Sequence, residues 1–147
     1  MDITTVWDVD DGQGDYAVES GALLAGHDVE TSILISVFSD RVADVNDVIP
    51  DSTTNNQPDP RGWWGDTDQQ YPIGSRLWLL DRSKGPLNVA KQAESFAKEA
   101  VQWMLDDGVV PLFDINAVWK SSDQLRLTII AYRADGSIIS NVSRDLW

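Results

Sequence analysis

The sequence lacks cysteine and contains a single histidine, His27, among its 147 residues. Without cysteine the chain forms no disulfide, offers no thiolate nucleophile and builds no zinc–thiolate site. A lone histidine excludes a metal site held by paired histidines and leaves only one histidine base for a serine-type hydrolase. The motifs Gly-x-Ser-x-Gly, GxxxxGK[ST] and GxGxxG are also missing. We therefore expect no cofactor, no metal and no catalytic residues.

Long apolar stretches are absent too. No run approaches the roughly 18–20 residues that a membrane span needs, so the sequence predicts no membrane insertion. The first residues, Met1 to Thr5, have neither the basic nor the apolar region of a secretory signal, and we expect none. The length of 147 residues predicts a single domain that spans residues 1–147.

Positive charge is scarce. The chain has 11 basic against 24 acidic residues and a formal net charge of −13. Because so few cations are available to neutralise phosphates, we expect no nucleic-acid binding. Residues 1–40 alone contain nine acidic residues and neither lysine nor arginine. This segment is either a solvated surface or a match for a basic partner, which leaves an acidic adaptor protein as one alternative function.

Part of the acidic N-terminal segment imitates a calcium-binding loop. Asp8, Asp10, Gly12 and Glu19 take the places of the first, third, fifth and twelfth loop residues. The fifth place lacks a ligand side chain, however, and Gln13 stands where the loop requires glycine. A solvated turn is therefore the better interpretation.

Asp106 and Asp107 form the obvious carboxylate pair for acid–base chemistry of the glycosidase kind. They precede Gly108 at the predicted end of a helix, where the helix dipole disfavours anions. Exposed acids before a helix stop are the simpler interpretation. The pair nevertheless keeps a second alternative open, a carboxylate-dependent peptidoglycan hydrolase (muramidase).

Apolar periodicity in the N-terminal half predicts a strand, a helix and a loop. Alternation with period two over residues 3–9 predicts a short strand. Residues 29–40 repeat apolar side chains at helical spacing, with Asp28 placed to act as an N-cap. Residues 46–62 contain three prolines and many turn formers, which predicts a long loop.

The C-terminal half predicts one long helix followed by a sheet. An apolar stripe rich in alanine runs over residues 86–106, with Pro86 suited to the first turn and Gly108 to the stop. Alternating strands are expected near residues 113–119, 125–131 and 137–142, with a hairpin turn at Asp135-Gly136. The predicted fold is α+β: an antiparallel C-terminal meander, the long amphipathic helix packed on it, and a shorter N-terminal helix beyond the proline-rich loop.

Seven tryptophans are the most informative positive feature. Trp103 and Trp119 lie in amphipathic elements and are predicted to be core. If the segment around Trp63 and Trp64 is a strand, these two face opposite ways, one toward the core and one toward a partner. All could instead cover the core of the domain itself. Because tryptophan and arginine dominate binding hot spots, the candidate partner-interface residues are Arg61, Trp63, Trp64, Asp66, Arg76, Trp78 and Trp147.

Several segments occur in a distinctive order: ILISVFSDR at 33–41, RGWWGD at 61–66 and GSRLWLL at 74–80. A long helix ending at residues 103–108, a meander and a terminal Leu-Trp follow them. From about Trp7 onward, the chain resembles the tail baseplate protein family of Mu-like phages and prophages, named after the product of Mu gene forty-six. That family is related to the wedge proteins of contractile tails, such as the W protein of P2-like phages.

The resemblance implies an α+β structural protein of the inner baseplate, present in several copies around the central spike hub. Its implied partners are a larger wedge protein, the hub or spike protein, the tail sheath, which starts on a β-edge, and the tube. The implied location is the virion tail, with assembly in the host cytoplasm. Many wedge proteins carry Glu-Pro-Arg where the long helix meets the meander. Here residues 105–109 read Leu-Asp-Asp-Gly-Val, so those contacts and the lysozyme label of some relatives do not carry over.

Overall fold

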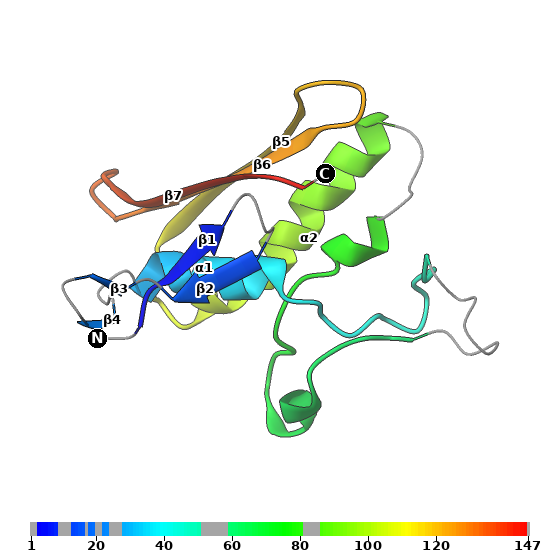
Figure 1. The fold of residues 1–147 in the computed structure, drawn as a ribbon, viewed down its shortest axis with the longest axis horizontal. Coiled ribbons are helices and arrows are strands. Elements are labelled where there is room, and N and C mark those ends of the chain that lie inside the picture. Colours follow the sequence, from blue (N-terminus) through cyan, green and yellow to red (C-terminus); the bar gives the residue numbers. More distant parts are fainter. Residues whose placement is uncertain are drawn as a thin grey trace.

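The computed structural model describes residues 3–8, 13–16, 18–19, 22–23, 28–50, 59–80 and 86–146 (Figure 1). Two helices and a three-stranded sheet form the body of the molecule. Their bounds are α1 Asp28–Phe38, α2 Pro86–Asp106, β5 Leu112–Trp119, β6 Leu125–Tyr132 and β7 Ile138–Asp145. Two short N-terminal hairpins pair β1 Thr5–Asp8 with β2 Gln13–Tyr16, and β3 Val18–Glu19 with β4 Ala22–Leu23. Two 3-10 helices, η1 Trp64–Asp68 and η2 Leu77–Leu80, lie between α1 and α2.

The C-terminal sheet is an antiparallel meander in the order β5-β6-β7, as the alternation predicts. The β6–β7 connection turns at Gly136, whose φ of +87° suits glycine. Along the central strand β6, alternate side chains are buried: Leu125, Leu127, Ile129 and Ala131. Because successive side chains point to opposite faces, one face of the sheet forms the core.

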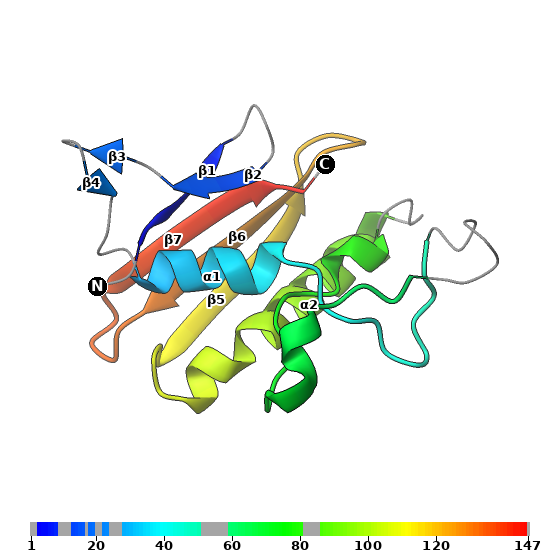
Figure 2. The ribbon, with the colours of Figure 1, turned by 60° about the horizontal axis from the view of Figure 1, so that its bottom comes forward.

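Both helices cover that same face of the sheet (Figure 2). Helix α2 packs mainly on β5, and α1 packs on β7. Ala93, Ala97 and Ala100 on the buried stripe of α2 bring the backbone close to its neighbours. Trp103 and Trp119, predicted to be core, pack against it but are only half-buried. The result is a two-layer α+β domain, which confirms the predicted fold class.

Helix α1 begins at Asp28 and α2 begins at Pro86, each within one residue of the expected start. The described parts of the proline-rich region, residues 46–50 and 59–62, contain no helix or strand. Residues 51–58 of that region lie outside the described residues. Among the described helices, none combines the length and apolar character that crossing a membrane requires.

Candidate partner interface

Residues 59–80 form a segment that returns from the proline-rich loop to the helices. Its anchor is Ser75, which pairs with the chain just after α1 in a parallel bridge. The amide of Ser75 donates to the carbonyl of Ser39 at 2.8 Å, and the amide of Arg41 donates to the carbonyl of Ser75 at 3.0 Å. Gly74 precedes this bridge with a φ of +95°. The two chains therefore meet backbone to backbone, where a side chain at residue 74 has no room.

Arg76, one of the predicted interface residues, is occupied inside the chain. Its guanidinium binds both carboxylate oxygens of Glu99 on α2, at 2.9 and 3.0 Å, and those of Asp47 at 3.0 Å. It also lies 4.8 Å from the ring centroid of Phe96. The hydrogen bonds to Glu99 are the largest influence that raises the pKa of Arg76. Arg76 therefore ties Asp47, near the start of the proline-rich loop, to Glu99 of α2.

Trp78 and Arg61 form a second internal cluster. The indole Nε1 of half-buried Trp78 donates to the carbonyl of Arg41 at 2.8 Å. Arg61 stacks over the indole of Trp78, 4.5 Å from its centroid, and pairs with Asp40 at 2.7 Å. Both side chains line a smaller pocket of about 300 Å³ with residues from the end of α1. Their contacts are to this chain, while Arg61 stays exposed at the rim.

Unlike those of Arg76 and Trp78, the side chains of Trp63 and Trp64 are exposed to solvent. Their exposed fractions are 48% and 86%. Trp64 begins the 3-10 helix η1, so the strand considered for this segment does not form. The two rings lie 5.4 Å apart with 48° between their planes, rather than on opposite faces of a strand. The structure thus presents a tryptophan pair to the outside.

The two glycines that flank this pair explain its geometry. Gly62 has a φ of +100° and lies against Val42, where an added Cβ would be 2.8 Å from the Val42 Cβ. Gly65 lies under the Trp63 indole, where an added Cβ would be 2.3 Å from the ring. Asp66 fixes the turn, since its Oδ1 accepts from the amide of Ile73 at 3.0 Å. The sequence Gly-Trp-Trp-Gly-Asp therefore encodes a compact turn that displays two indoles.

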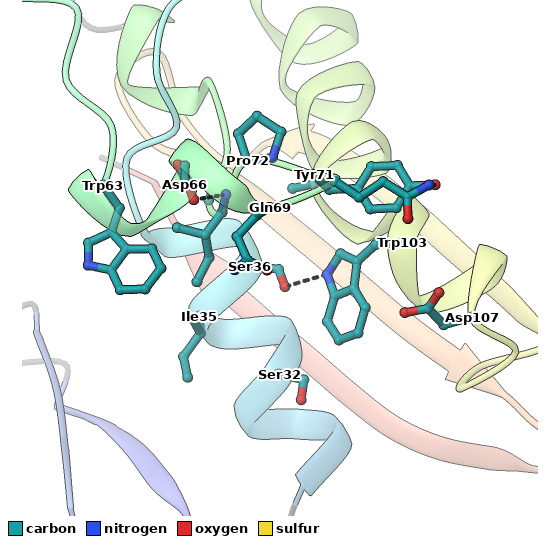
Figure 3. Close-up of a pocket in the computed structure, with 14 residues that line it drawn as sticks. Ser32, Ile35, Ser36, Trp63, Asp66, Gln69, Tyr71, Pro72, Trp103 and Asp107 are labelled. Carbon is teal, nitrogen blue, oxygen red and sulfur yellow. Dashed lines mark hydrogen bonds between the residues drawn. The ribbon is translucent and has the colours of Figure 1, made fainter.

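A pocket of about 430 Å³ opens beside this turn, between α1, α2 and residues 63–74. Figure 3 shows the Trp63 indole on one side of Ile35 and Ser36 of α1, and the Trp103 indole on the other. Trp103 is held by a hydrogen bond of 3.0 Å from its Nε1 to Ser36 Oγ. Sequence reasoning assigned Trp103 to the core and missed its second role as a pocket wall. Its i, i+4 relation to Asp107 was the available signal.

The two carboxylates at the end of α2 lie at the pocket and beside it. Asp107 lines the pocket. Asp106 Oδ2 accepts from the Tyr71 hydroxyl at 3.3 Å, and its Oδ1 accepts from Gln102 at 3.0 Å. The charge of Asp106 is the main influence that raises the pKa of Tyr71. Asp106 is thus engaged with neighbours, whereas Asp107 faces the pocket.

Some predicted positions lie beyond what the structure describes. Trp147, His27, Asp10 and Gly12 are outside the described residues, and the side chains of Asp8 and Glu19 are likewise not described. Within the described part of the chain, no group of three His, Cys, Asp or Glu side chains could hold a metal ion. The solvated turn preferred over the calcium-like loop at residues 8–19, and the contact of Trp147, therefore stay predictions.

Comparison with known proteins identifies the family of this chain. A sequence model of the family described as phage protein GP46 matches residues 29–138, well over half of the chain. The chain belongs to this GP46 phage protein family. The match covers α1, residues 59–80, α2 and the first two strands of the meander.

Two GP46 relatives align with nearly the whole chain. Baseplate protein gp46 of Escherichia phage Mu is 36% identical over 138 residues, which cover 94% of this chain and 91% of the relative. The Mu-like prophage FluMu protein gp46 of Haemophilus influenzae is 29% identical over 147 residues, which cover 99% and 97%. These matches confirm the Mu-like family that the sequence resembles. The name of the Mu relative supports a structural role in a phage baseplate.

Proposed function

We propose that this chain is a non-enzymatic inner-wedge component of a contractile phage tail baseplate. It contacts a larger wedge protein and the hub or spike protein, and it provides an edge on which the tail sheath starts, next to the tube. Several copies occur in each virion baseplate, and assembly takes place in the host cytoplasm. Support comes from the family membership and from the two exposed tryptophans, Trp63 and Trp64. The proposal includes no nucleic-acid binding and no membrane insertion.

The observation that carries the proposal is the exposed tryptophan pair. Exposed indoles on an ordered turn bury a large area on binding and lose little conformational freedom, which is the character of a hot spot. The turn is ordered by hydrogen bonds from the amides of Asp66 and Gln69 and from the Thr67 hydroxyl to carbonyls within it. Of the other candidates, Asp66 binds the amide of Ile73 within this segment. Arg61, Arg76 and Trp78 bind other parts of this chain. We assign the direct contact to Trp63 and Trp64.

Replacement of Trp64 by alanine tests this assignment. Because the Trp64 side chain is largely exposed, the Tm should change by no more than about 2 °C. Capture of the neighbouring wedge protein on co-expression should fall by about tenfold or more. Tyr16→Ala is the matched control, since Tyr16 is an exposed aromatic on β2, and it should capture normally. Normal capture by the Trp64 variant, or equal loss in both variants, would contradict the assignment.

The two outer edges of the sheet differ in their capacity to accept a further strand. On β5, the outward amide of Ala117 already donates to Glu94 Oε1 of α2 at 2.9 Å. Just after β7, the amide of Leu146 donates to the carbonyl of Leu125 on β6. The backbone N–H and C=O groups of every second residue before Leu146 therefore point toward β6, and those of the residues between them point away from it, to the outer edge. Asn141 is an exposed member of that outward set. Among the described residues, no hydrogen bond from one backbone group to another reaches this outer edge.

We therefore assign the sheath-initiating edge to β7. The carbonyl of Ser143 on this edge accepts from Arg144 at 2.8 Å, a local contact that a strand would replace there. The backbone N–H and C=O of Asn141, which also point to this edge, do not take part in the contact between Arg144 and Ser143. Addition of a strand would satisfy these groups through main-chain hydrogen bonds.

Substitution of Asn141 by proline tests the edge. Proline removes the outward N–H but leaves the hydrogen bonds to β6 in place, so the domain should fold with a small loss of Tm. Baseplates carrying Asn141→Pro should form without sheath in electron micrographs. Asn141→Ala keeps the amide and should give sheathed tails. Sheathed tails with the proline variant would show that the sheath starts elsewhere.

A further inference from the structure

We propose that the pocket between α1, α2 and residues 63–74 receives an arginine side chain from a partner protein. This inference rests on the proposed role of the same face as a partner interface. It also names the chemical group of the partner that binds there. The pocket, of about 430 Å³, has the size of a small ligand site. One extended side chain and the backbone that carries it need no more room.

The lining suits a group that is apolar along its length and cationic at its tip. Ile35 provides an apolar floor between the two indoles (Figure 3). Trp103 offers an aromatic wall, and Asp107 stands one helical turn beyond it, where Figure 3 places the carboxylate past the indole. Tryptophan is the best aromatic partner for a cation, and a carboxylate beside it adds charge attraction. An arginine stem over Ile35 would bring its guanidinium to Trp103 and Asp107.

The distribution of charge around the pocket leaves an unmatched excess of negative charge. None of the described residues that line the pocket is basic, whereas Asp66 and Asp107 are acidic. The nearby arginines are already engaged with carboxylates of this chain: Arg41 with Glu99, Arg61 with Asp40, and Arg76 with Glu99 and Asp47. In contrast, the two acids that line the pocket, Asp66 and Asp107, form no ion pair within the described part of the chain.

Asp66 adds a second, independent indication. One of its oxygens binds the amide of Ile73, while its buried Oδ2 has no hydrogen-bond partner among the described residues. A buried carboxylate oxygen without a partner is costly. Asp66 lies on the Trp63 side of the pocket (Figure 3), so a cation at Trp103 and Asp107 offsets this cost only through its longer-range field. Arginine fits better than lysine, because its planar guanidinium stacks on an indole and meets a carboxylate with two donors.

The test uses the full chain and two small probes, acetyl-arginine-amide and acetyl-citrulline-amide. The two probes have nearly the same shape, but citrulline is neutral. In an NMR titration, the indole N–H signals of Trp63 and Trp103 should shift with the arginine probe, with a Kd of about 1 mM. The citrulline probe should bind about fivefold more weakly or worse. Equal binding of the two probes, or no shift with arginine, overturns the inference.

The matched variants are Asp107→Asn and Asp123→Asn. Each removes one exposed carboxylate, but Asp123 lies in the β5–β6 turn, away from the pocket. Asp107→Asn should weaken the arginine probe about fivefold, and Asp123→Asn should leave it unchanged. Equal effects would mean attraction by net charge alone and would overturn the pocket assignment.

The probe titration and the capture assay test the arginine pocket and the proposed contact surface separately. If Trp64→Ala abolishes capture while the two probes bind equally, the face is an interface but the pocket does not read arginine. If the arginine probe binds selectively while Trp64→Ala captures normally, the pocket inference holds and the proposed contact surface is wrong.

Discussion

Gly74→Ala is expected to lower the free energy of unfolding by about 3 kcal/mol. The φ of +95° at residue 74 is strained for any residue with a Cβ. The added Cβ would also stand 2.5 Å from the carbonyl oxygen of Ser39 and 2.8 Å from the amide nitrogen of Arg41. Both are backbone atoms fixed by the bridge to Ser75, so neither can move without loss of those hydrogen bonds. Urea denaturation with an unchanged m-value measures the loss.

Gly136→Ala is the matched control for backbone strain. Gly136 has a similar φ of +87°, but nothing lies within 4 Å of an added Cβ. Its substitution should therefore cost only the conformational part, about 1 kcal/mol. The difference between the two variants isolates the close approach of residues 39–41 and 74. If both variants lose the same stability, the parallel bridge is not the tight junction described here.

The junction at Gly74 also positions the surface that carries the proposed function. Residues 63–74 wall the pocket, and the Asp66–Ile73 hydrogen bond connects the tryptophan turn to the chain just before the bridge. A loosened bridge should therefore weaken partner capture in addition to stability. Trp64→Ala, in contrast, should weaken capture alone.

The elements that the sequence predicted well are those whose signals are local. Helix α2 combines a proline at its start, a glycine after its end and an apolar stripe, and its observed bounds agree with the expected ones. The meander rests on alternation and on the Asp135-Gly136 turn, which are also properties of neighbouring residues. Such patterns reflect the periods of the helix and the strand, so they need no knowledge of tertiary contacts.

The region between α1 and α2 could not be predicted in the same way. Its turn at Trp64–Asp68 depends on the contact of Gly62 with Val42 and on the fold of Trp63 over Gly65. Arg76 finds Asp47 and Glu99 on segments distant in sequence. The sequence therefore identified the residues of this surface but not which of them face inward. Only the assembled contacts separate Arg76 and Trp78 from Trp63 and Trp64.

Arg76→Met is expected to lower the free energy of unfolding by about 2–3 kcal/mol. The variant keeps most of the aliphatic stem on Phe96 but removes the cation, which leaves Asp47 and part of Glu99 without their partner. Removal of one partner from a fully buried pair costs more, but the loss here is smaller because the Arg76 side chain is 19% exposed to solvent. The pKa of Arg76 is raised above an already high value, so Arg76 stays charged across the neutral range. The stability lost through removal of this charge should therefore not vary between pH 6 and pH 9.

Arg126→Met provides the comparison that gives this result its meaning. Arg126 also binds a carboxylate through two nitrogens, at 2.8 and 3.3 Å from Asp145, but its side chain is 44% exposed on the open face of the sheet. Its loss should be much smaller and should shrink further at high salt, because exposed pairs are screened. A double-mutant cycle of Arg76→Met with Glu99→Gln should show a coupling energy of about 1–2 kcal/mol. If the coupling is close to zero, the ion pair of Arg76 with Glu99 does not stabilise the contact of the 59–80 segment with α2, and the proposed role of this pair is wrong.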